Sequence, residues 1–130
     1  MTTTQLALMT RAKMTIAQTK ASLPQDMGEG VMLTDALFFE PQLTLQFSFT
    51  IPNMYEIDDP EEKEDAIEFQ KGMICMGLCS DSSSIELLDN GFIFKYMYFD
   101  TSGNMSHVIE ITKDVFMSTL QEINEEMEDE

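Results

Sequence analysis

The sequence predicts an α+β fold in the order α-β-β-α-β-β-α, with an antiparallel sheet of two hairpins covered by helices. Two observations predict this class. Two stretches alternate apolar and polar side chains with a period of two, which is typical of half-buried antiparallel strands. Segments before, between and after them repeat apolar residues at the spacing of one helix face. Hairpins with helices between them indicate one sheet covered on one side.

The first segment, residues 4–22, has the helical pattern. The residues of its apolar face follow the i, i+4 and i+7 spacing of one side of a helix, and are Leu8, Ala12, Ile16, Thr19 and Leu23. The threonines of residues 2–4 can cap this helix. Pro24 ends it.

The clearest strand follows at residues 42–51. Its inward positions alternate strictly with threonine, glutamine and serine, and are Leu43, Leu45, Phe47, Phe49 and Ile51. Residues 31–39 are the predicted partner strand, and residues 40–42 form a short turn between the two. Together they make the first hairpin.

A helix is predicted to begin at Asp59, which can act as N-cap. Pro60 suits the first helical position, and Glu62 lies where a capping box places its acid. The predicted apolar face of this helix is Ala66, Phe69, Met73 and Met76. Residues 82–89 form a further short helix, which the Asn-Gly pair at 90–91 stops.

The second hairpin comprises residues 92–99 and 105–112, joined by a glycine-containing turn at 100–104. In its first strand, aromatic residues occupy every second position, at Phe92, Phe94, Tyr96 and Tyr98. A last helix begins at Lys113, with Thr112 as N-cap. Its apolar face is Phe116, Leu120, Ile123 and Met127. All 130 residues therefore form one acidic domain, with a tail that can fray from about residue 122.

Several short motifs occur in a fixed succession. They are Leu23-Pro24, Gly30, the long alternating strand, Cys79-Ser80-Asp81, residues 87–91 and the aromatic hairpin at 94–104. This succession resembles a group of small bacterial α/β lipoproteins, whose relatives include pilotins of type II secretion. The resemblance covers roughly residues 20–114. It implies a compact domain of helix, hairpin, helix and hairpin, and it supports the fold more than the function.

Members of that group usually carry a cleaved lipoprotein signal and a second cysteine after the last strand. This sequence has no lipobox, and Val115 and Phe116 stand at the position of that cysteine. A second likeness, in size, acidity and element order, is to class I chaperones of type III secretion. Those chaperones are small acidic dimers that hold a secreted effector, so a homodimer is compatible with the sequence.

The charge is the unusual feature of the composition. The chain carries 24 acidic and 7 basic residues, a net charge of −17. Such a field repels nucleic acid and anionic membranes and favours encounter with basic proteins. The sequence therefore predicts a basic protein partner and no direct binding of nucleic acid or membrane. Acidity that only keeps the protein soluble is the alternative.

The acids gather in two blocks. The second is the C-terminal run that starts at Glu122. The first is the candidate partner-binding site and comprises Glu56, Asp58, Asp59, Glu61, Glu62, Glu64, Asp65 and Glu68. Carboxylates spaced over several helical turns can imitate the charges of a nucleic-acid backbone. A solvated helix face is the plain alternative.

The sequence offers little chemistry for catalysis. His107 is the single histidine, and it falls in a predicted strand. The predicted fold allows a catalytic pair of His107 with Cys75 or Cys79. No motif marks a third residue that would orient the histidine, or a site that would stabilise an oxyanion. Two cysteines and one histidine are too few for a structural zinc site. We therefore expect no enzyme activity, no catalytic residue, no metal and no cofactor.

Cys75 and Cys79 lie four residues apart, so a disulfide between them would stabilise little. We expect reduced thiols. The chain also has no apolar run long enough to span a membrane, and its first residues do not form a signal peptide. From these observations we expect a cytoplasmic protein.

Methionine is frequent, with 12 residues. Six fall on or near predicted apolar faces, namely Met73, Met76, Met97, Met105, Met117 and Met127. Methionine fills irregular cores, and it also suits adaptable binding surfaces. The pattern alone favours core filling.

The first functional hypothesis is an acidic inhibitor that occludes a basic partner, such as a nucleic-acid-binding enzyme or a toxin. An immunity protein, a phage-encoded defence inhibitor and a nucleic-acid mimic all fit it. The alternative is a secretion chaperone or pilotin-like carrier that holds a client protein segment in an apolar groove or on a free sheet edge.

Overall fold

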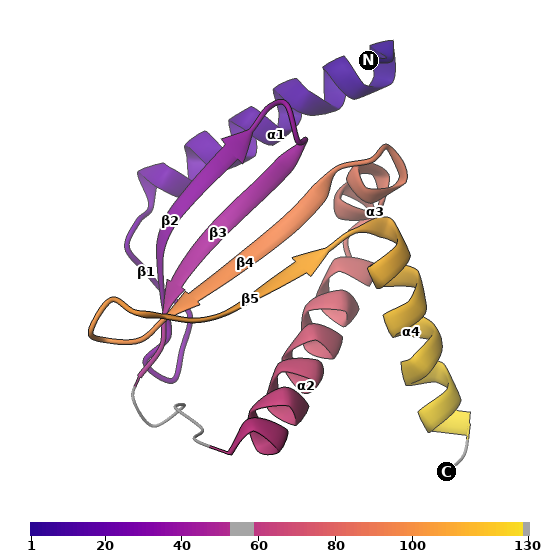
Figure 1. Ribbon diagram of the computed structural model, residues 1–130. Coiled ribbons are helices and arrows are strands. Elements are labelled where there is room, and N and C mark those ends of the chain that lie inside the picture. The colour runs from indigo at the N-terminus through magenta and orange to yellow at the C-terminus, as the bar shows by residue number, and fades with distance from the viewer. Residues whose placement is uncertain (53–58, 129–130) are drawn as a thin grey trace.

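The computed structural model describes residues 1–52 and 59–128. The elements of these residues, in chain order, are α1 Thr3–Ala21, β1 Gln25–Asp26, β2 Met32–Phe39, β3 Thr44–Thr50, α2 Pro60–Cys79, α3 Ser82–Asp89, β4 Ile93–Phe99, β5 Met105–Ile111 and α4 Lys113–Glu128 (Figure 1). The predicted α+β class and order of main elements are confirmed. The structure adds β1, which is too short to leave a periodic pattern in the sequence.

The strands form one sheet in the order β1-β2-β3-β4-β5. Both predicted hairpins are antiparallel, but β3 and β4 run parallel, with Phe47 opposite Tyr96. The sheet is therefore mixed rather than purely antiparallel. The reason is the connection through α2 and α3, which returns the chain to the starting end of β3 before β4 begins.

The two faces of the sheet differ as the alternation predicts. Leu45, Phe94 and Ile111 are almost fully buried on the face that the helices cover. The opposite face carries Gln46 and Lys95, which lie side by side on β3 and β4. The core therefore lies between one face of the sheet and the helices.

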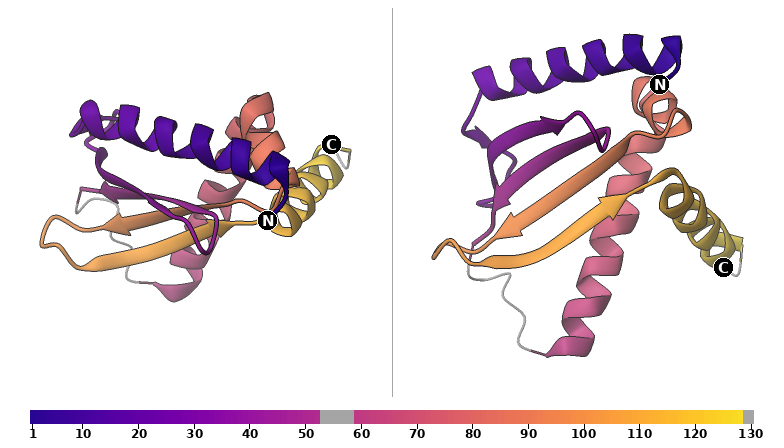
Figure 2. Two further views of the ribbon diagram at one scale, coloured as in Figure 1. Left: turned by 90° about the horizontal axis from the view of Figure 1, so that it is seen from above. Right: turned by 45° about the horizontal axis from the view of Figure 1, so that its top comes forward.

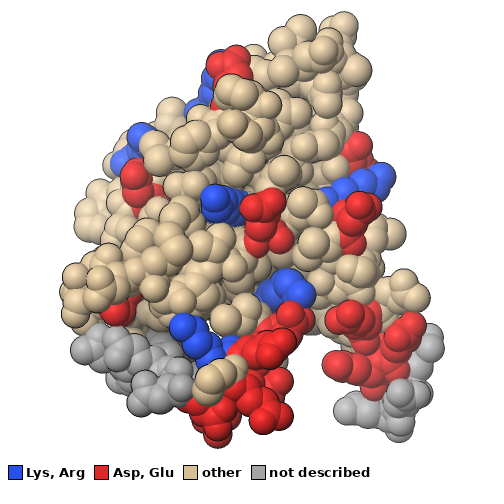
Figure 3. Space-filling model, viewed as in Figure 1, with Lys and Arg blue, Asp and Glu red and all other residues tan. Residues whose placement is uncertain are grey.

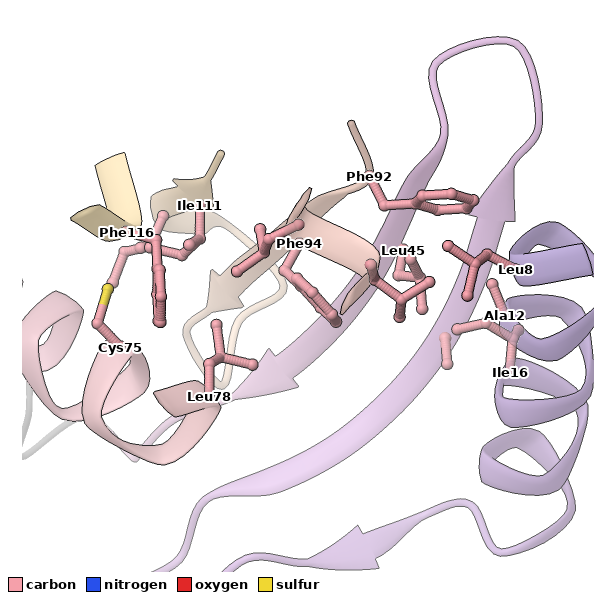
Figure 4. Close-up of a cluster of buried hydrophobic side chains, with 14 of the residues drawn as sticks. Leu8, Ala12, Ile16, Leu45, Cys75, Leu78, Phe92, Phe94, Ile111 and Phe116 are labelled. Atoms are coloured by element: carbon pink, nitrogen blue, oxygen red, sulfur yellow. The ribbon is translucent and has the colours of Figure 1, made fainter. Parts of the chain in front are cut away.

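Helix α1 covers the β2–β3 half of that face. Leu8, Ala12 and Ile16 of the predicted apolar face are buried, and Figure 4 shows them pointing toward Leu45. The predicted cap at the start of the helix is present. The Thr2 hydroxyl accepts a hydrogen bond from the backbone N–H of Gln5 at 3.0 Å.

Helix α2 buries a different face from the one predicted. Cys75 and Leu78 are buried, and Ile67 and Ile74 pack beside them against the core. The predicted face is exposed to solvent, at Ala66, Phe69, Met73 and Met76. This helix has apolar residues on two sides, and packing against α3, α4 and β5 selects one of them. The expected N-cap holds, since Asp59 accepts a hydrogen bond from the N–H of Glu61.

Helix α4 packs against β5 and α2 through Phe116 and Thr119, both buried. Figures 1 and 2 show α2 and α4 close together near α3 and separating toward the start of α2 and the end of α4. The helix-covered face thus has two groups of helices, α1 on one side and α2, α3 and α4 on the other.

The position of Leu45 at the centre of this core gives a stability test. Replacing Leu45, which is 1% exposed, by alanine removes buried apolar area and leaves a cavity. We expect the free energy of unfolding to fall by about 2 to 5 kcal/mol, measured by urea denaturation.

Met14→Ala on α1 is the matched control, because Met14 is exposed. It should change the unfolding free energy by less than about 0.5 kcal/mol. Equal effects of the two substitutions would contradict the assigned core.

Candidate protein-binding site

A groove of about 400 Å³ lies on the helix-covered face of the sheet. We call it the sheet groove. Its walls are α1, the region of β1, the end of α2 and α3, including Arg11, Thr15, Leu78, Ser83 and Leu87. Its floor is formed by β2, β3 and β4, at Leu33, Leu45, Phe47, Phe49, Phe94 and Tyr96.

Half-buried aromatic rings, those of Phe47, Phe49 and Tyr96, make the open part of this floor, and the buried Tyr98 continues their row. The ring centroids of Phe47 and Tyr96 are 5.7 Å apart, and those of Phe49 and Tyr98 are 5.1 Å apart. The rings are stacked in a row because β3 and β4 are paired in register, Phe47 to Tyr96 and Phe49 to Tyr98. Rings held in this way are rigid apolar contact surface, which costs little conformational entropy to use in binding.

The two tyrosines remain uncharged at physiological pH. Burial raises the pKa of the Tyr98 hydroxyl to about 12. Burial, together with the nearby Tyr98, raises the pKa of Tyr96 well above its ordinary value. Of the two, Tyr96 lines the sheet groove, so the floor carries an uncharged hydroxyl that can hydrogen-bond.

Polar bridges fix one end of the sheet groove. The Arg11 guanidinium of α1 donates to the backbone oxygen of Ser83 on α3 at 3.0 Å and lies 3.6 Å from the Glu86 carboxylate. The Gln5 amide donates to the backbone oxygen of Asn90 at 2.9 Å. The Arg11 contacts join α1 to α3 at the groove wall, and the Gln5 bond joins the same two elements beyond the groove-lining residues. The groove is therefore preformed.

The acidic block predicted as a partner-binding site lies elsewhere. Glu56 and Asp58 are outside the described residues. The other members are exposed on the first turns of α2, and are Asp59, Glu61, Glu62, Glu64, Asp65 and Glu68. None of these six lines the sheet groove. The structure instead places Asp65 and Glu68 across one groove from Glu122 and Glu126 of α4, which belong to the second acidic block.

His107 of β5 stands beyond the end of the aromatic row and stacks on Tyr98 at 4.6 Å. Its Nε2 lies 2.7 Å from the Gln70 amide oxygen, and its Nδ1 lies 2.9 Å from the Ser106 hydroxyl. Burial, and then the charge of Lys63, lower the pKa of His107. Both ring nitrogens are thus hydrogen-bonded to neutral groups, which indicates a structural role for His107.

The cysteines are unpaired, as expected. Cys75 is buried and Cys79 is exposed. Burial raises the pKa of the Cys75 thiol, against the effect of its hydrogen bond with Thr119. A raised pKa disfavours the thiolate, which is the reactive form.

Within residues 1–52 and 59–128, no group of three or more histidine, cysteine or acidic residues is arranged to hold a metal ion. No helix in the same residues is both long and apolar enough to cross a bilayer.

Met9 of α1 is part of the core, but most of the methionines on the predicted apolar faces are not. Of the six on predicted apolar faces, five are exposed, namely Met73, Met76, Met105, Met117 and Met127. The favoured interpretation as core residues is therefore wrong for these five, because the core is completed by branched and aromatic side chains. Their exposure is compatible with the alternative, an adaptable binding surface.

Three solved structures share this fold. A protein from Pseudomonas aeruginosa described as a "putative secreted protein" has a TM-score of 0.69 at 10% identity, covering 89% of this chain and 98% of its own. The pilotin EpsS of the Vibrio vulnificus type 2 secretion system has a TM-score of 0.64 at 12% identity, covering 87% and 94%. The type II secretion pilotin AspS from Vibrio cholerae has a TM-score of 0.60 at 16% identity, covering 86% and 94%.

The chain has a pilotin-like fold. The resemblance seen in the sequence motifs is therefore confirmed at the level of the fold. No family model matches the chain, and no curated protein has a significant match to it.

The expected cytoplasmic location is wrong by the same comparison. The structures with this fold are a protein described as secreted and pilotins of secretion systems. The expectation rested on composition and on the first residues of the chain. Net charge and reduced cysteines are compatible with several compartments, so they did not determine the location.

The environment of His107 predicts a pH dependence of stability. Because the folded-state pKa is below the ordinary value of 6.5, the unfolded chain binds more protons between the two pKa values. The contribution of His107 is therefore fully present above pH 6.5 and is lost as the pH falls toward the folded-state pKa. The difference in unfolding free energy between the wild type and His107→Gln should increase as the pH rises from the folded-state pKa toward 6.5, and level off above it.

Urea denaturation of both proteins at several pH values measures this difference. Because the many carboxylates are common to both proteins, their titration cancels. A difference that is constant, or that decreases as the pH rises, would contradict the assigned environment.

Proposed function

We propose that this chain is a non-enzymatic carrier that holds a segment of a client protein in the sheet groove. The observation that carries the proposal is the preformed groove with its uncharged aromatic floor, on a fold that pilotins share. A groove of this kind suits an apolar segment that becomes ordered on binding.

The chemistry of the floor supports this choice of occupant. Phe47, Phe49 and Tyr96 offer flat apolar surface, while Thr15, Ser83 and Asp81 at the walls offer hydrogen-bonding groups. This combination of an apolar centre and a polar rim is typical of protein-binding surfaces. Catalysis would require activated groups, whereas the tyrosines are neutral and the histidine is engaged by Gln70 and Ser106.

The acidic-inhibitor hypothesis receives less support. Two of the three structures described above with this fold are pilotins, and none of the three is described as an inhibitor. The acids on α2 also stand apart from the aromatic groove. We therefore assign the client segment to the groove and treat the acids as part of a separate surface.

A blocking substitution tests the carrier function. Thr15 is exposed on α1 and lines the groove, so Thr15→Trp places a large ring over the aromatic floor without disturbing the core. We expect the wild-type chain to retain a protein partner from its native cell in high salt, and Thr15→Trp to lose it. Affinity capture followed by mass spectrometry measures both.

Ala17→Trp is the matched control, because Ala17 is exposed on the same helix outside the groove. It should retain the partner. Retention by Thr15→Trp, or release of the wild-type partner by modest salt, would contradict an apolar client in this groove.

A further inference from the structure

A second groove, of about 500 Å³, lies between α2 and α4, where the two helices diverge. We call it the interhelical groove. It is lined by Asp65, Glu68, Phe69, Gly72, Met73 and Met76 of α2 and by Thr119, Glu122, Ile123 and Glu126 of α4. Figure 3 shows acidic side chains on both sides of the notch between these two helices. The two acidic blocks of the sequence therefore meet across one surface feature.

The floor of the interhelical groove is apolar and unusually exposed. Phe69 is 71% exposed, Met73 57% and Met76 51%. These residues are the ones that the sequence pattern assigned to a buried helix face. Large apolar side chains exposed together on a soluble protein mark an interaction surface more often than single exposed residues do.

The rim of the groove carries only negative charge. Asp65 and Glu68 stand on one side, and Glu122 and Glu126 on the other. None of the residues that line it is basic. Lys71 is the nearest basic residue on α2, and it is paired with Glu68 at 2.9 Å.

We propose that the interhelical groove binds a basic amphipathic helix of a partner protein. The apolar face of such a helix would cover Phe69, Met73 and Met76, and its lysines or arginines would reach the carboxylates on both rims. Methionines adapt their shape to different apolar faces, and matched charges raise the association rate. This proposal is independent of what the sheet groove holds.

Other occupants fit the groove less well. Nucleic acid and anionic membranes would place negative charge against the acidic rims. A symmetric dimer through this face would place the four rim carboxylates of one copy against those of the other. The helix α1 of a second copy is basic at Arg11, Lys13 and Lys20, and self-association through it is one outcome of the test.

A model peptide tests the proposal directly. The probe is a short amphipathic helical peptide of leucine and lysine, titrated into the full chain and followed by calorimetry. We expect saturable binding that weakens several-fold as ionic strength rises, because the rim charges are solvent-exposed. The same peptide with glutamate in place of lysine should not bind.

Three paired variants locate the binding. Phe69→Gln with Met73→Gln removes the apolar floor, and Glu122→Gln with Glu126→Gln removes one rim. Each pair should weaken peptide binding by about tenfold or more. Glu61→Gln with Glu64→Gln is the matched control, since these acids lie on α2 outside the groove. It removes the same charge and should leave the affinity almost unchanged.

Two results would overturn the proposal. Equal weakening by the control pair and the rim pair would mean that net charge alone attracts the peptide. Concentration-dependent self-association in sedimentation experiments, abolished by the floor pair, would mean that the groove holds a second copy of this chain. Because Thr15→Trp leaves the interhelical groove intact, the peptide test and the carrier test can fail separately.

Discussion

The parallel pairing of β3 with β4 is the constraint on which the rest of the structure depends. It requires a connection that returns to the starting end of the sheet, and α2 and α3 supply it. That crossover places α2 and α3 over the second hairpin while α1 covers the first. The aromatic floor of the sheet groove lies where the two hairpins meet, between the two groups of helices. Both the groove and its in-register rings therefore follow from one pairing.

Much of this fold can be predicted from local patterns. Strict alternation at residues 43–51 and 92–98 defines two strands and their buried faces, and Leu8, Ala12 and Ile16 define the inner face of α1. Strand direction is different, because a period-two pattern is the same for parallel and antiparallel neighbours. The mixed sheet could not be read from alternation, although the length of the helical connection allows it.

Helix α2 shows why the candidate sites were harder to predict. Its sequence has one apolar stripe at Ile67, Ile74 and Leu78 and another at Phe69, Met73 and Met76. Helical spacing alone cannot say which stripe meets the sheet. The structure buries the first, which is mainly branched aliphatic, and exposes the second, which is rich in methionine. The sheet groove was missed for a related reason, since it is formed by residues far apart in the chain.

The acidic rims of the interhelical groove and its exposed apolar stripe have complementary effects on what can bind there. An uncovered row of phenylalanine and methionine promotes self-association, but carboxylates on both rims repel a second copy that presents the same face. With a net charge of −17, this repulsion acts over the whole molecule and is strongest where the two acidic blocks converge. A basic partner experiences the opposite force, so the same charges that keep the stripe free also select what can cover it. Specificity at this surface thus requires no close fit of every side chain, which suits the flexible methionines that form it.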